Sequence, residues 1–162
     1  MVLAACGGGR GGDYVAAPVE CAPFARALTG VALAGSGADW WWQAEGGYTR
    51  TEWPQVGSVL VFRRSGRLPS GHVAVVSRVL SRREIMVTQA SWVRHRVTED
   101  QLVIDVSKVG DWSVVRVWWP ASGQMGLTDY RTFGFIRPDR PIGHDQLVAA
   151  TPTAIRIAER GW

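Results

Sequence analysis

One cysteine of this chain has the neighbours that thiol chemistry needs. Cys21 begins a segment whose apolar residues have helical spacing, and it directly follows the turn-like 17–19 segment. A helix N-terminus and a nearby imidazolium lower a thiol pKa from about 8.5 to ~3.5–7.5, and the thiolate is the nucleophile. The position therefore suits a catalytic cysteine, although an arbitrary cysteine is more often a small buried core residue.

A histidine and a glutamine follow at positions that can serve this thiol. His72 opens a predicted strand after the Ser70-Gly71 turn, and Gln89 lies on the next predicted strand. Cross-strand neighbours in an antiparallel pair stand about 5 Å apart, so we expect Gln89 to reach the His72 ring. Nucleophile, base and polar orienting group would then follow one another in the chain, paired in space rather than in sequence.

The elements that must position these residues read as an α+β domain. Helices are predicted at Glu20–Leu28 and Ala38–Gly46 from apolar spacing and terminal glycines. The predicted strands are Gly57–Arg63, His72–Leu80, Ile85–Gln89, Ser113–Trp119 and Thr132–Arg137. Successive strands lie too close together for crossover helices, so we expect an antiparallel sheet of about five to six strands.

Composition excludes several classes of protein. The 162 residues suffice for one core, and no apolar run approaches the roughly 18 residues of a membrane span. The net charge of +4 is modest and the basic residues are scattered, so we expect no nucleic-acid partner. With two cysteines and no HExxH or His-x-x-x-His spacing, no metal site and no cofactor are expected.

The two ends differ in composition from the middle. Leu3-Ala4-Ala5-Cys6 resembles the lipobox of bacterial lipoproteins, so a lipid anchor on Cys6 is expected if the start is truncated. We expect residues 1–12 to be a flexible segment, residues 13–137 to form the catalytic domain, and residues 138–162 to be a C-terminal extension.

Four segments between residues 14 and 92 resemble the CHAP domain, a cysteine- and histidine-dependent amidohydrolase/peptidase module. Residues 20–30 (ECAPFARALTG) resemble its nucleophile helix, and residues 54–62 (PQVGSVLVF) its P-x-x-G-D strand, with Ser58 where Asp is more usual. Residues 71–76 (GHVAVV) match its histidine strand, and residues 87–92 (VTQASW) align with its V-x-E-x-N-W strand. The resemblance implies a papain-like fold whose nucleophile helix packs on the sheet.

The resemblance also assigns roles to the three polar residues. Cys21 is implied as the nucleophile and His72 as the general base. Gln89 stands where the family usually has Glu. A carboxylate would orient the ring and stabilise its positive form, whereas an amide only orients it, by accepting a hydrogen bond from Nδ1.

Acyl transfer further requires hydrogen-bond donors for the developing oxyanion. The backbone N–H of Cys21 is one candidate, and the side chains of Glu20 and Tyr14 are others. Ser91 stands where the family often has Asn, and we count it as a secondary site residue.

Two tryptophans are candidates for the substrate cleft. Trp92 follows the predicted strand that carries Gln89. Trp41 lies in the Trp40–Trp42 run, whose three rings cannot all face one way on a helix. Flat apolar rings suit the faces of amino sugars, whereas core packing is the alternative for the run.

The resemblance implies a peptidoglycan hydrolase. It would cleave an amide bond of the bacterial cell-wall peptide through a thioacyl-enzyme, as an amidase or endopeptidase. Such an enzyme would be secreted, periplasmic or associated with the cell envelope, and we expect a monomer with peptidoglycan as its partner. Two alternatives remain, namely a non-catalytic cell-wall-binding or scaffold module of the same fold and a cytoplasmic small-peptide amidase.

Overall fold

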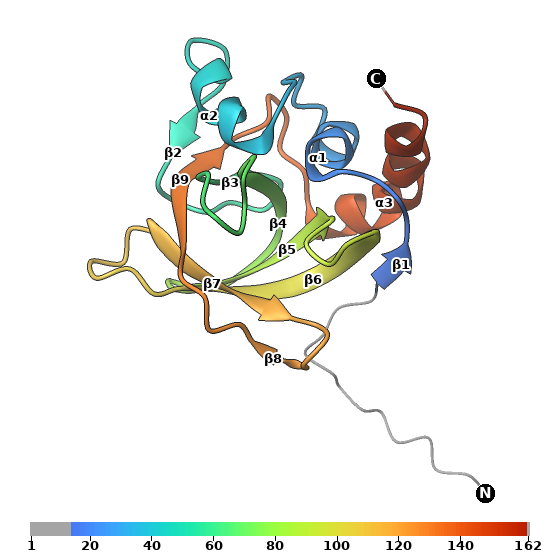
Figure 1. Ribbon diagram of the computed structural model, residues 1–162. Coiled ribbons are helices and arrows are strands. Elements are labelled where there is room, and N and C mark those ends of the chain that lie inside the picture. The colour runs from blue at the N-terminus through green and yellow to red at the C-terminus, as the bar shows by residue number, and fades with distance from the viewer. Residues whose placement is uncertain (1–13, 162) are drawn as a thin grey trace, which may run out of the picture.

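The computed structural model describes residues 14–161 and consists of an antiparallel β-barrel with helices against one side (Figure 1). The helical elements are α1 (Cys21–Thr29), η1 (Gly37–Asp39), α2 (Trp40–Gln43) and α3 (His144–Glu159). The strands are β1 (Tyr14–Ala16), β2 (Arg50–Thr51), β3 (Val59–Phe62), β4 (His72–Ser81), β5 (Glu84–Ala90), β6 (Arg96–Asp105), β7 (Val114–Trp119), β8 (Gln124–Met125) and β9 (Tyr130–Ile136). The α+β class is confirmed.

The sheet is larger than the sequence predicted, and it is closed. Strands β3, β4, β5, β6, β7 and β9 pair in that order, and β9 pairs back with β3, so six strands form a ring. Strands β1, β2 and β8 are added at the margins. The prediction of a simple sheet of five to six strands is therefore wrong in extent and in topology.

Strand β6 makes the difference between a sheet and a barrel. It pairs with β5 on one side and with β7 on the other. Its sequence, RVTEDQLVID, carries charged residues in the middle, and Asp100 has a left-handed backbone (φ 51°). Buried side chains alternate at Gln101, Val103 and Asp105, as in a half-buried strand. Because two of these three residues are polar, the sequence does not show the apolar alternation that predicts such a strand.

The helices α1 and α3 pack side by side against the barrel (Figure 1). In α1, Phe24, Ala25 and Leu28 are buried at helical spacing, and Gly30 ends the helix with a left-handed backbone (φ 75°). The predicted short second helix is shorter than expected, since η1 and α2 together end at Gln43. Among the described residues, no helix is both long and apolar enough to cross a membrane.

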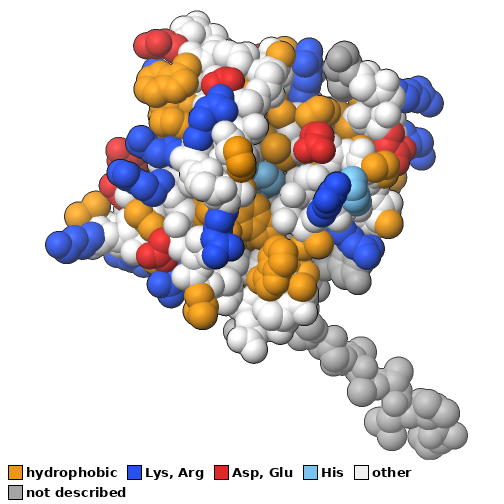
Figure 2. Space-filling model, in the orientation of Figure 1, with side chains coloured by type: hydrophobic (Ala, Val, Ile, Leu, Met, Phe, Trp, Pro, Cys, Tyr) orange, Lys and Arg blue, Asp and Glu red, His pale blue; other side chains and the backbone are white. Residues whose placement is uncertain are grey.

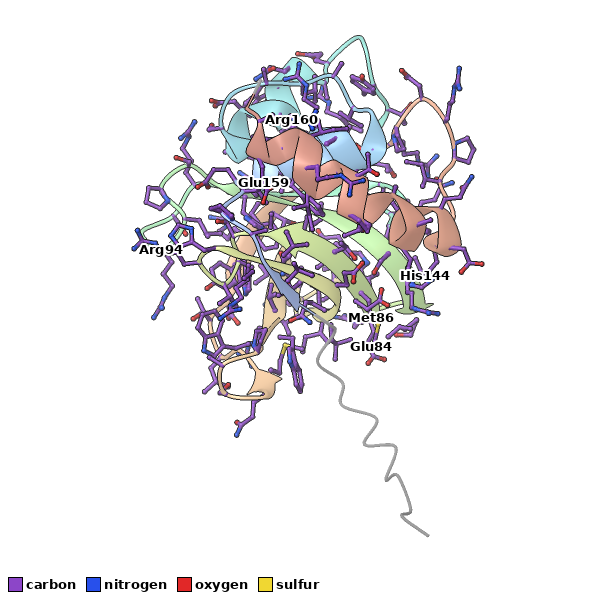
Figure 3. All side chains as sticks on the ribbon, turned by 90° about the vertical axis from the view of Figure 1, so that its right-hand side faces the viewer. Glu84, Met86, Arg94, His144, Glu159 and Arg160 are labelled. Carbon is purple, nitrogen blue, oxygen red and sulfur yellow. The ribbon has the colours of Figure 1, made fainter. Side chains whose placement is uncertain are left out.

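Helix α3 lies within the segment predicted as a C-terminal extension. Figure 3 shows it lying across the strands, with His144 at one end and Glu159 and Arg160 at the other. Leu147, Ala154 and Ala158 join the hydrophobic cluster that also holds the buried face of α1. The division of the chain at residue 138 stays a prediction, but this helix contributes to the core that supports α1.

The strand β4 separates two hydrophobic clusters because successive side chains of a strand point to opposite faces. Val73 and Val75 belong to the cluster beneath the helices, whereas Ala74 and Val76 belong to the cluster inside the barrel. His72 is the first residue of β4 and contacts Phe62, a member of the interior cluster. The His72 ring thus packs on the interior cluster, while the next residue, Val73, faces α1.

Candidate active site

Cys21 is the first residue of α1 and carries a free thiol. The backbone N–H of Val73 lies within hydrogen-bonding reach of the sulfur, as do the N–H groups of Ala22 and Cys21 itself. Val73 directly follows His72 in β4. The sulfur of the nucleophile candidate therefore lies beside the backbone that follows the base candidate, at the junction between α1 and β4.

His72 and Gln89 form a buried hydrogen bond. The distance between His72 Nε2 and Gln89 Oε1 is 2.8 Å, and the two residues are 3% and 1% exposed. The expected contact between the two side chains is present, but it uses Nε2 and not Nδ1. When Nε2–H donates to the amide oxygen, Nδ1 is the basic nitrogen of the ring.

Two aromatic rings pack on His72, and a third packs on those two. The ring centroid of His72 lies 5.3 Å from Phe62 and 5.1 Å from Trp92, and Trp92 lies 4.9 Å from Tyr130. Tyr130 begins β9, so its place in the site depends on closure of the barrel, and the sequence gives no local signal for it. The His72–Gln89 hydrogen bond is therefore buried beside aromatic rings.

Burial keeps both reactive groups neutral. Desolvation lowers the pKa of His72 to about 4, although the hydrogen bond to Gln89 opposes this shift. Desolvation also raises the pKa of the Cys21 thiol, and the charge of Glu20 adds to the effect against the nearby backbone N–H groups. Both shifts favour the neutral thiol and the neutral imidazole over an ion pair.

Two glycines let the η1 segment approach His72. A Cβ added to Gly37 would lie 2.9 Å from the backbone carbonyl carbon of His72. Gly71 has a left-handed backbone (φ 67°), and its Cβ would lie 2.5 Å from the Cβ of Ala38. A side chain at position 37 would displace the backbone of His72, and one at position 71 would displace Ala38 or the end of β3.

One protein-family model matches the chain. The model of the CHAP domain matches residues 10–91, which is half of the 162-residue chain. The chain belongs to the CHAP family. No curated protein matches it. Membership associates the chain with hydrolases of the amidase and peptidase kind.

The matched part of this CHAP domain holds Cys21, His72 and Gln89, together with the residues predicted to assist them. Glu20 is exposed at the N-cap of α1, and its charge acts against a thiolate. Ser91 has a left-handed backbone (φ 61°), a conformation that Asn tolerates better than Ser. The side chain of Tyr14 and the whole of Cys6 lie outside the described residues.

The two predicted cleft tryptophans have different surroundings. Trp92 and Ser91 line a cavity of about 630 Å³ beside the His72 ring. Trp41 does not line it. Its ring stacks on that of Phe133, with 5.7 Å between the ring centroids, and the guanidinium of Arg50 lies 5.1 Å from the Trp41 ring centroid. Within residues 14–161, no cluster of three or more His, Cys, Asp or Glu side chains could hold a metal ion.

Proposed function

We propose that this CHAP domain hydrolyses an amide bond of the peptide part of bacterial peptidoglycan, by a cysteine mechanism. The observation that carries the proposal is that the Cys21 sulfur lies near the backbone of Val73, the residue after His72, whose ring is hydrogen-bonded to Gln89. A thiol, a basic ring nitrogen and an orienting amide are the parts that nucleophilic acyl transfer needs.

In the acylation step, the sulfur of Cys21 attacks the carbonyl carbon while Nδ1 of His72 accepts the thiol proton. The carbon–sulfur bond forms, and the carbon–nitrogen bond breaks as His72 returns that proton to the leaving amine. The backbone N–H groups of Cys21, Ala22 and Val73 lie near the sulfur, and in this proposal they donate to the oxyanion. The product of this step is a thioacyl-enzyme and a free amine.

In the deacylation step, His72 takes a proton from water and the resulting oxygen nucleophile attacks the thioester carbon. The carbon–sulfur bond breaks, the sulfur recovers a proton from the imidazolium, and a carboxylic acid leaves. Gln89 acts as a positioning residue, because its oxygen holds Nε2–H and so keeps Nδ1 basic. Without a carboxylate at position 89, the imidazolium of each step lacks a counter-charge from that side chain.

The substrate places the protein outside the cytoplasm, and we propose a secreted, periplasmic or envelope-associated monomer. One feature favours the alternative of a non-catalytic wall-binding module, namely Gln89 in place of the family's usual Glu. The alternative predicts that Cys21→Ala leaves binding to peptidoglycan and every downstream effect unchanged.

Digestion of purified peptidoglycan tests the proposal. Wild type and Cys21→Ser are incubated with it, and the released fragments are analysed by mass spectrometry. The proposal expects new free amine and carboxyl termini at one type of amide bond, absent with the variant. Glycan reducing ends as the new termini, or the same fragments from the variant, would contradict it. Trp42→Ala is a matched control, since this exposed ring lies outside the His72–Gln89 contacts.

A further inference from the structure

The cavity that Trp92 lines, next to the His72 ring, is formed by three segments of the chain. Its walls come from the loop before β4, from the β7–β8 hairpin and from the segment that leads into β9. Trp92 connects the cavity to the candidate general base, since its ring lies 5.1 Å from that of His72. Apart from Arg67, Leu68 and Ser91, the lining residues follow position 91, where the family match ends. The cavity is therefore built mainly by the part of the chain beyond the matched family core.

The wall is largely apolar. Trp119, Met125, Leu127 and Tyr130 line it, and Leu127 and Trp119 remain 85% and 40% exposed. Figure 2 shows hydrophobic side chains gathered over the lower part of this face, where Figure 1 places β8. Apolar area of this kind, open to solvent and continuous with Trp92, favours a ligand with an apolar body.

The charge of the wall is positive. Arg67 is exposed, lines the cavity and makes no ion pair among the described residues, and no Asp or Glu contributes to the lining. Asp129, in the neighbouring loop, is held by Arg116 at 2.7 Å. A guanidinium without a carboxylate partner binds a ligand carboxylate through two parallel hydrogen bonds.

The hairpin is fixed in place by a glycine. The N–H of Gly126 donates to the carbonyl of Val117 at 2.9 Å, and a Cβ at position 126 would lie 2.7 Å from that oxygen. Strand β8 is thereby held against β7, with Trp119 opposite Gln124. This side of the cavity is thus held by backbone hydrogen bonds of the protein itself. A ligand does not have to order it on binding.

We propose that this cavity binds a peptide residue with an apolar side chain and a free carboxylate, on one side of the amide bond that is cleaved. The inference rests on the proposed function for its place in the reaction, but the recognition itself does not require turnover. Trp119, Met125 and Leu127 contact the side chain, and Arg67 pairs with the carboxylate.

Binding to the full-length Cys21→Ala variant tests this inference by itself. N-acetylphenylalanine is titrated and followed by tryptophan indole N–H resonances, in parallel with its primary amide and with N-acetylserine. The acid is expected to bind at least ten times more tightly than either comparator. Arg67→Gln removes the preference for acid over amide, and Leu127→Asp, at an exposed position, weakens binding of the acid at least tenfold. Arg82→Gln, in the exposed β4–β5 turn, is the matched control and changes nothing.

The outcomes separate this inference from the proposed function. Equal binding of all three ligands, tighter binding of N-acetylglucosamine, or no effect of Arg67→Gln and Leu127→Asp would overturn the inference, even if wild type digests peptidoglycan. If the protein binds the acid selectively but cleaves no peptidoglycan, the binding site is supported and the proposed reaction is contradicted.

Discussion

The Nε2 atom of His72 lies 2.8 Å from Oε1 of Gln89 in a buried, aromatic-walled position, and Gln89 carries no charge. Where a carboxylate would favour the imidazolium, this amide only orients the ring. The amide nitrogen of Gln89 is buried without a hydrogen-bond partner among the described residues. With no charge at position 89 to oppose desolvation, the neutral form of the His72 ring is favoured.

Gln89→Glu should raise the pKa of His72. A carboxylate at hydrogen-bond distance favours the charged ring and opposes the desolvation that holds this pKa at about 4. The acid limb of kcat/KM, where the base becomes protonated, should move up by about 1–2 pH units. The ring resonances of His72 in an NMR titration provide the check. An acid limb that stays in place, or moves to lower pH, would contradict the neutral pair.

Cys21 should react as an ordinary thiol at neutral pH. Burial and the charge of Glu20 raise its pKa above the usual value of 9.0. In a Cys6→Ser background, the rate of alkylation by iodoacetamide should rise steadily as pH increases toward and beyond 9, with no fast plateau at pH 5–7. Glu20→Gln should shift the profile to lower pH. A fast plateau at acidic pH in wild type would indicate a preformed ion pair.

The burial of neutral His72 should make stability depend on pH. The pKa of His72 is lowered from 6.5 to about 4 on folding, so the unfolded chain takes up the proton first as pH falls. This contribution is complete above pH 6.5 and is lost between pH 6.5 and about 4, by about 3 kcal/mol in total. Urea unfolding of wild type and His72→Gln across this range measures it. If the two proteins lose stability in parallel, His72 does not carry the effect.

Gly71→Ala should destabilise the fold and impair the site together. The new Cβ would lie 2.5 Å from Ala38 Cβ and 2.6 Å from the carbonyl oxygen of Phe62, at a left-handed φ of 67°. We expect a loss of about 3 kcal/mol in the free energy of unfolding, with reduced activity in the fraction that remains folded. Gly66→Ala, on the same loop with no atom within 4 Å of its Cβ, is the control and should be close to neutral.

Local patterns were sufficient for the elements that hold the reactive residues. The helical spacing from Cys21 and the β-branched run after His72 correspond to α1 and β4, because α1 buries one apolar face and the first half of β4 is buried on both faces. Strand β6 could not be predicted in this way, since Glu99 and Asp100 interrupt its pattern and its pairing partners are distant in sequence.

The residues around the candidate active site could not be predicted from local sequence, because the tertiary structure brings them together. Tyr130 reaches Trp92 only because the barrel closes, and the cavity depends on how the β7–β8 hairpin lies against the loop before β4. The ring nitrogen that contacts Gln89 is decided by the orientation of His72, which spacing does not specify. Trp41 was predicted as a cleft residue from its type, but its packing against Phe133 and Arg50 is a property of the fold.

The most direct measurement is acid-quenched mass spectrometry of the protein itself during digestion of soluble peptidoglycan fragments. A mass increase equal to the acyl part of the substrate is expected, located on the peptide that contains Cys21. It should be absent in Cys21→Ala and greatly reduced in His72→Gln. Release of amide-cleavage products with Cys21 unmodified at every time point, or undiminished cleavage by Cys21→Ala, would contradict the thioacyl-enzyme on which the account depends.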